Sequence, residues 1–131
     1  MSESRLVAYL DHMLEAAGQA CSYVDGLSKE EFLLDRRTQQ AVILNLVILG
    51  EAATKALKDD SPFLDKHPGV PWRSMKGMRN RVAHGYFSID LEVVWETVQT
   101  ALPELLEMLP AIRADAEAAT GASADGSAPS A

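Results

Sequence analysis

Apolar residues recur at intervals of three and four along most of this chain, the spacing that places side chains on one face of an α-helix. The pattern is clearest from Leu6 to Val24 and from Leu91 to Leu109. Strand-like alternation and internal repeats are both lacking from the sequence. With 131 residues, enough for one domain, the chain is predicted to be all-α and to form an up-and-down four-helix bundle.

Turn and cap signals separate the first two predicted helices. The first helix runs from Leu6 and ends at Asp25-Gly26. Ser28 and Glu31 then have the spacing of a capping box, in which each side chain bonds a free backbone N–H of the other residue. This box predicts a short helical turn that extends through Leu33.

The central predicted helix starts at Asp35, a good capping residue, and runs to about Leu57. Residues 41–53 are apolar nearly all round, which places this helix in the middle of the bundle. Gly50 costs about 1 kcal/mol of helix propensity, and close packing against a neighbouring helix would explain it. A loop from residue 59 to residue 71, with at most one helical turn, is expected next.

Pro71 suits the first position of a third helix, residues 72–84, which Gly85 ends. Asp90 caps a fourth helix, and Pro103 inside that helix should kink or restart it. The domain is expected to span residues 1–113. Residues 114–131 are mostly small or polar and are expected to form a disordered tail.

Cysteine content and hydropathy limit the compartment and the kind of site. A single cysteine, Cys21, rules out an intrachain disulfide framework and a cysteine-rich zinc site. The start of the chain has no secretory pattern, and the longest apolar run, residues 41–50, is far shorter than a membrane span. A soluble cytoplasmic protein without membrane association is expected.

Charge is distributed unevenly along the sequence. The formal net charge of −7 argues against broad, non-specific binding to nucleic acid. However, residues 66–89 hold five basic residues and no acidic one, whereas the rest of the chain has seven basic and nineteen acidic residues. Either a confined anionic substrate binds at this segment, or the segment is simply a solvated basic helix face.

The third predicted helix has a polar face. At 100° per residue, Asn80 and His84 stack on this face beside Arg73. Gly77 lies on the same side and leaves room there for a ligand or a second chain. Arg81 lies further round and is also expected to be exposed.

Arg79 is the anomaly of this helix because it projects within the apolar stripe. A buried guanidinium without an acceptor is costly, and the best candidate acceptor is Glu51 in the central helix. Two interpretations stay open. The pair either fixes helix packing only, or Glu51 holds Arg79 at the wall of a cleft where its fork binds a phosphate.

An isolated histidine on a polar helix face is usually not catalytic, but the neighbours of His84 favour chemistry. Arg79 precedes it by five residues, an amide shares its face, and Tyr86 follows the helix-ending Gly85. If the helix ends there, Tyr86 can swing to the mouth of a site. The alternative is that Tyr86 is a core aromatic residue paired with Phe87.

The run Gly-Met-Arg-Asn-Arg-Val-Ala-His-Gly-Tyr, residues 77–86, resembles the HEPN superfamily and specifically its HepT-like toxins. The HEPN signature is an arginine, four to six residues and a histidine, and Arg79 and His84 match it. The HepT-like branch adds a tyrosine two residues after the histidine, here Tyr86. The resemblance covers roughly residues 4–110 and includes residues 48–52, 72–80 and 88–95.

This resemblance implies a metal-independent endoribonuclease that acts as a homodimer and needs no cofactor. RNA supplies its own nucleophile, the 2′-hydroxyl, so that His84 would transfer protons and Arg79 would stabilise the phosphorane. Asn80 would orient the phosphate or the imidazole. The basic residues expected to attract RNA are Arg73, Lys76 and Arg81.

The resemblance also implies a partner protein. Toxins of this kind are typically encoded beside a minimal nucleotidyltransferase, an MNT-type antitoxin, which silences them by adenylylating the tyrosine that corresponds to Tyr86. A different class of function remains open as the alternative. The same helical fold can serve as a catalytically silent module that binds a nucleotide or a protein partner.

Overall fold

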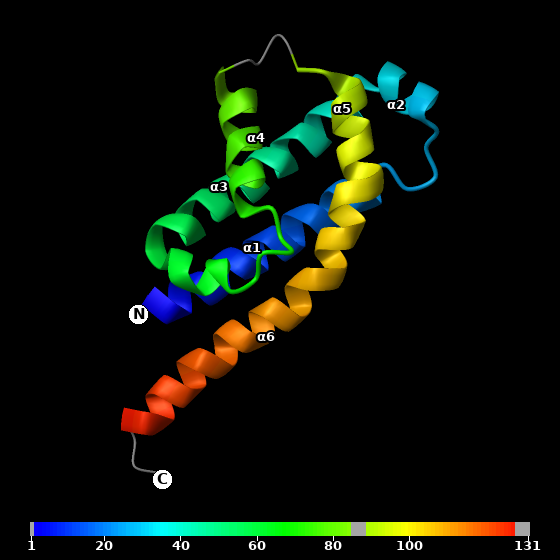
Figure 1. Cartoon of the computed structure of the whole chain (residues 1–131). Helices are drawn as coiled ribbons and strands as arrows, with labels where there is room; N and C mark the ends of the chain where they lie inside the picture. Colours follow the sequence, from blue (N-terminus) through cyan, green and yellow to red (C-terminus); the bar gives the residue numbers. More distant parts are fainter. Residues whose placement is uncertain (1, 85–88, 128–131) are drawn as a thin grey trace.

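The computed structural model describes residues 2–84 and 89–127, with side chains described for residues 5–80 and 89–119. Every regular element in these ranges is helical, and none of the described residues forms a strand. The predicted all-α class is confirmed, and the helices form an up-and-down bundle (Figure 1).

The first two helices follow the predicted turn and cap signals. Helix α1 (Ser2–Tyr23) is followed by a turn in which Gly26 has a φ of +83°, a left-handed conformation that favours glycine. Helix α2 (Lys29–Leu34) begins with the predicted capping box. The Glu31 N–H donates to Ser28 Oγ at 3.1 Å, and the Ser28 N–H donates to Glu31 Oε1 at 2.8 Å.

Helix α3 (Arg36–Asp65) is longer than the sequence predicted. Asp35 caps it as expected, accepting a backbone N–H at 3.0 Å. The predicted end near Leu57 lies close to a break at Asp60, where the backbone leaves helical geometry with φ −154° and ψ 59°, and the short helical piece that follows to Asp65 is the one turn expected in this segment. Pro62 accounts for the kink, since a proline removes one helical hydrogen bond and clashes with the carbonyl four residues before it.

The loop before the next helix is therefore short, covering residues 66–71. The Trp72 indole Nε1 donates to the carbonyls of Leu64 and His67, both at 3.1 Å. These two bonds tie the loop to the start of α4 (Trp72–His84), which begins where the sequence predicted.

The predicted fourth helix is divided into three parts. Helix α5 (Leu91–Glu96) starts at the predicted cap, Asp90, whose carboxylate accepts two backbone N–H groups. A π-helical segment, η2 (Thr97–Ala101), and helix α6 (Leu102–Ser127) follow. The interruption predicted at Pro103 is confirmed, and Figure 1 shows the chain changing direction between α5 and α6.

Helix α6 continues beyond residue 113, where the sequence placed the end of the domain. Ala116 is buried, and Asp115 Oδ2 lies 3.8 Å from His67 Nε2 in the loop before α4. Arg113 pairs with Asp11 of α1 at 2.6 Å and with Glu117 at 2.9 Å. The expected boundary at residue 113 therefore lies inside a packed helix, because contacts with distant segments hold this part of α6.

Each helix of the bundle packs against at least one other helix. Helix α1 contacts both α3 and α6, α4 packs against α3, and the short α2 contacts α3 and α5 (Figure 1). The core is formed by apolar side chains of all these helices, with Phe32 of α2 fully buried 5.3 Å from the Trp95 ring of α5. Among the described helices, α3 alone is long and apolar enough to cross a membrane, and here it is a central helix of the bundle.

Candidate active site

Helices α3 and α4 approach each other closely at Gly50. A Cβ atom added to Gly50 would overlap Arg79 Cβ and lie 2.7 Å from the Met75 carbonyl oxygen. A side chain at this position would therefore force the two helices apart. The prediction that Gly50 serves close packing against a neighbouring helix is confirmed, and the neighbour is the turn of α4 that carries Arg79.

The structure brings Arg79 and Glu51 together at this contact. Arg79 Nε lies 3.1 Å from Glu51 Oε1, and the two side chains are 27% and 46% exposed. The Nε atom is buried, but its N–H is not aligned for a hydrogen bond with the carboxylate. Arg79 thus lies at the edge of the α3–α4 contact rather than deep in the core, and the contact is an ion pair with a carboxylate that solvent reaches.

Lys55 is a basic residue near this pair that the sequence analysis did not include. Its Nζ lies 4.0 Å from Glu51 Oε2, one helical turn along α3, and its side chain is 56% exposed. The Glu51 carboxylate therefore lies between two cations from different helices. The four-residue spacing of Glu51 and Lys55 was the available signal, but the sequence could not show that Arg79 shares the same carboxylate.

The predicted polar face of α4 is open. Asn80, Lys76 and Arg73 are exposed, and a Cβ added to Gly77 would meet no atom within 4 Å. Arg73 Nη1 lies 3.7 Å from Asp65 Oδ1, which offsets part of its charge. Lys76 makes no ion pair with any residue whose side chain the structure describes.

Two of the predicted site residues are placed only by their position in the chain. His84 is the last residue of α4, five residues after Arg79, so its backbone lies about 7.5 Å further along the helix axis. The side chains of His84 and Arg81 lie outside the described side chains. Tyr86 and Gly85 lie outside the described residues altogether.

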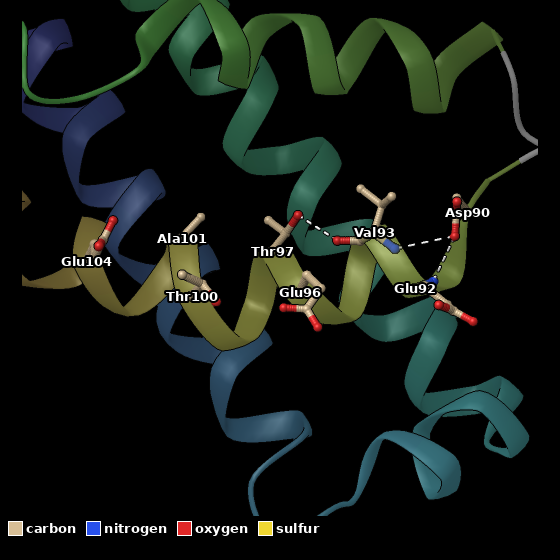
Figure 2. A pocket seen from close by; sticks show the side chains of 8 residues that line it. All are labelled: Asp90, Glu92, Val93, Glu96, Thr97, Thr100, Ala101 and Glu104. Atoms are coloured by element: carbon tan, nitrogen blue, oxygen red, sulfur yellow. Dashed lines mark hydrogen bonds between the residues drawn. The ribbon is translucent and has the colours of Figure 1, made fainter.

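A hollow outside the α3–α4 contact has the wrong charge for an anionic substrate. It lies along α5, η2 and the start of α6, and Figure 2 shows the side chains that line it. Four of these are carboxylates, those of Asp90, Glu92, Glu96 and Glu104. Lys29 lies 3.3 Å from Glu92 and offsets one of them. A polyanion would be repelled here, so the basic residues of α4 and α3 form the better candidate site.

Among residues whose side chains are described, no cluster of three histidine, cysteine or acidic side chains could hold a metal ion. The groups at the α3–α4 contact are instead the Arg79 guanidinium and the Lys55 ammonium on either side of the Glu51 carboxylate, and the Asn80 amide is exposed on the neighbouring face of α4. Such donors bind and orient an oxyanion.

An all-α bundle with an arginine and a histidine five residues apart on a basic helix fits the HEPN class of domains. Within that class the chain belongs to the family described as Ribonuclease HepT-like, which it matches over residues 13–112. The matched region includes α3 and α4 and therefore the whole candidate site.

Several relatives cover most of this chain. A protein named as a candidate RNase in Methanocaldococcus jannaschii is 34% identical over 117 residues, which are 89% of this chain and 94% of the relative. A protein named as a probable ribonuclease HepT in Thermococcus cleftensis is 39% identical over 97 residues, which are 74% of this chain and 86% of the relative. No solved structure gives a significant match.

Proposed function

We propose that this protein is a metal-independent endoribonuclease and the toxin of a toxin–antitoxin pair. The observation that carries the proposal is the match to the HepT-like ribonucleases over a region that includes α4, the helix that holds Arg79 and His84. Two relatives named as ribonucleases support the same activity, and this chain aligns with 94% and 86% of their lengths. The ion pair of Arg79 with a carboxylate at the α3–α4 edge also supports it, because a held guanidinium is preorganised for an anion.

In the proposed reaction the 2′-oxygen of one ribose attacks the adjacent phosphorus, and the bond from phosphorus to the 5′-oxygen breaks. The products are a 2′,3′-cyclic phosphate and a free 5′-hydroxyl. His84 transfers the proton that leaves the 2′-hydroxyl or the proton that the 5′-oxygen gains. Arg79 stabilises the additional negative charge of the phosphorane, and Asn80 orients the phosphate.

Binding of the RNA backbone is assigned to basic side chains on two helices. Lys76, Arg73 and Arg81 of α4 are proposed to attract phosphates, with Lys55 of α3 at the edge of the same site. These contacts are confined to one part of an acidic protein, so that RNA is expected to approach in one orientation. The proposed location of the reaction is the cytoplasm, where RNA substrates occur.

A test of the activity compares wild type with His84→Ala on tRNA and mRNA pools in the presence of a chelator. Cleavage should be lost in His84→Ala, while the melting temperature should stay nearly unchanged because the polar face of α4 contributes little to the core. His12→Ala, which changes an exposed histidine on α1, is the matched control and should cleave normally.

An active, purified His84→Ala protein would refute the ribonuclease assignment at this residue. A wild type that binds RNA or nucleotide but cleaves neither pool would instead favour a catalytically silent binding module.

The proposed control point is Tyr86, modified by an MNT-type nucleotidyltransferase antitoxin. An AMP group two residues from His84 would place a phosphate and a base where the RNA backbone must lie, and its charge would occupy the basic groups. Modification should therefore inhibit cleavage without unfolding the bundle. Tyr86→Phe should remain an active nuclease that this route cannot silence.

The modification is tested by incubating the protein with the antitoxin and ATP, followed by intact-mass measurement and a cleavage assay. Tyr23→Phe, which changes another exposed tyrosine, is the control and should still gain the mass of AMP. A gain of AMP on Tyr86→Phe would contradict the proposed site. An unmodified wild type that is nonetheless inhibited would point to steric masking by the antitoxin.

A further inference from the structure

We propose that Gly50 and Glu51 of α3 act together as a positioning element for Arg79 during RNA cleavage. This inference rests on the proposed function and assigns a role to α3, the helix that does not carry the Arg79–His84 motif. Gly50 sets how near the Arg79 backbone lies to α3. Glu51, the next residue, then fixes the direction of the guanidinium.

Gly50 sets the distance between α3 and the turn of α4 that carries Arg79 by steric contact. A Cβ on Gly50 would overlap Arg79 Cβ, lie 3.1 Å from Arg79 Cα and lie 2.7 Å from the Met75 carbonyl oxygen. Backbone atoms and a Cβ cannot rotate away, so an added methyl group must move this turn of α4 as a whole. The buried small residues nearby on α3, Ala52 and Ala53, do carry a methyl group.

The residue of α4 that lies opposite Gly50 is Arg79. Close helix packing alone would be served by a glycine against any small or apolar residue of α4. Here Gly50 lies against Arg79, and the adjacent Glu51 contacts the same side chain at 3.1 Å. Two consecutive residues of α3 thus determine the depth and the direction of one arginine.

Glu51 contacts the guanidinium of Arg79 at the Nε atom, 3.1 Å from Oε1. Buried Nε forms this ion pair without an aligned hydrogen bond, so the attraction is electrostatic, and the two terminal amino groups carry the other four N–H donors. An arginine held in this way presents its terminal fork to an oxyanion. Lys55 Nζ lies 4.0 Å from Glu51 Oε2, on the other side of the carboxylate.

The test is the single-turnover cleavage rate of Gly50→Ala. A misplacement of about 1 Å can cost on the order of 100-fold in rate, so a loss of roughly 10- to 100-fold in kcat is expected. The KM for RNA should change little, because the charge of Arg79 stays near the phosphates. Gly18→Ala is the control, since a Cβ on this α1 glycine meets no atom within 4 Å, and it should cleave like wild type.

A double-mutant cycle separates positioning from simple destabilisation. Lysine keeps the same Cβ as arginine but has no fork, so the melting-temperature change caused by Gly50→Ala should be the same in wild type and in Arg79→Lys. The loss of kcat should be large in wild type and nearly absent in Arg79→Lys. Equal losses in both backgrounds would overturn the proposal, as would a fully active Gly50→Ala.

A second readout does not depend on activity. The ¹⁵Nε–Hε resonance of Arg79, assigned by its absence in Arg79→Lys, should shift in Gly50→Ala and in Glu51→Gln but not in Gly18→Ala. An unchanged resonance would overturn the positioning role even if the rate falls. If wild type cleaves no RNA, the proposed function fails, whereas this shift still decides whether Gly50 positions Arg79.

If Gly50→Ala does not fold, Glu51→Gln takes its place in the double-mutant cycle with Arg79→Lys. Glu51→Gln keeps the helix spacing and removes only the negative charge that pairs with Arg79 Nε. Its loss of kcat should also be nearly absent in Arg79→Lys. A Glu51→Gln protein with wild-type kcat and an unshifted Arg79 resonance would overturn the proposal.

Discussion

The thiol of Cys21 donates a hydrogen bond to the Val98 carbonyl across the contact between α1 and η2, with Sγ 3.8 Å from the oxygen. This carbonyl has lost its donors within the helix. The Leu102 N–H, four residues on, donates to the Thr97 carbonyl instead, and Pro103, five residues on, has no N–H. Cys21, which is partly buried against the core, therefore satisfies a backbone group that the proline left free.

Cys21→Ala should lower stability by about 0.5–1 kcal/mol because it leaves the Val98 carbonyl without this donor. Cys21→Ser keeps a donor and should lose less. Burial raises the pKa of the Cys21 thiol. Its stabilising effect is therefore complete below the unfolded-state value of about 8.5 and declines as the pH rises above it. Urea unfolding at pH 7 and pH 10 tests this, and a Cys21→Ala protein as stable as Cys21→Ser would contradict it.

The residues of the candidate site were predictable only as far as sequence spacing reaches. The stacking of Asn80 and Arg73 on an exposed face of one helix follows from 100° per residue, and both are exposed. The pairing of Arg79 with Glu51 followed from the need of a buried charge for an acceptor. Lys55 was missed because its place at the site depends on how α3 and α4 pack, which no spacing within one helix encodes.

Helix starts were well predicted because caps are local. Ser28, Asp35 and Asp90 each bond a backbone N–H two or three residues ahead, so that the signal and its effect lie within one turn of sequence. The end of α6 was missed because it depends on a distant partner. Arg113 is held by Asp11 of α1, a contact that separates the two residues by 102 positions.

Asp35 allows the contribution of one cap to be tested by pH. Its pKa lies below the usual value, first because the Thr38 hydroxyl donates to the carboxylate at 2.7 Å and then because the Thr38 N–H donates to it. The charged form is thus favoured in the folded state. Stability from this group is present above the unfolded-state pKa of about 3.9 and is lost as the pH falls through the lower folded value.

The expected outcome is that Asp35→Asn loses less stability than wild type when the pH falls from 5 to 3, measured by urea unfolding. Asp25→Asn is the control, because Asp25 lies in the turn after α1 and caps no helix that the structure describes. An identical decline in wild type and Asp35→Asn would show that the Asp35 cap does not contribute to acid sensitivity.

At the scale of the whole molecule, the hollow along α5, η2 and α6 is lined by carboxylates, whereas the exposed face of α4 carries basic side chains. The carboxylates that line the hollow of α5, η2 and α6 (Figure 2) would repel a polyanion, whereas the exposed Arg73 and Lys76 of α4 would attract one. With a net charge of −7 on the whole chain, the proposed RNA substrate is expected to approach through the α4 side. A single copy offers one short basic face, and a second copy beside it would provide two motifs along one RNA strand.

The predicted homodimer is tested at Gly77, on the exposed face of α4. Within the monomer a Cβ at this position would meet no atom within 4 Å, so the packing of one chain does not explain a glycine that weakens the helix. A partner chain that packs closely against this face would explain it. Gly77→Arg should therefore leave the melting temperature of the isolated bundle unchanged but block the interface, giving a monomer with strongly reduced cleavage.

Gly18→Arg is the matched control, because Gly18 is equally open but lies on α1, and this variant should remain a dimer with normal activity. Light scattering across micromolar concentrations measures the mass of each variant. A monomeric wild type in this range would count heavily against the dimer. A Gly77→Arg protein that stays dimeric would place the interface elsewhere, and a monomeric Gly77→Arg protein with full activity would show that one motif is sufficient for cleavage.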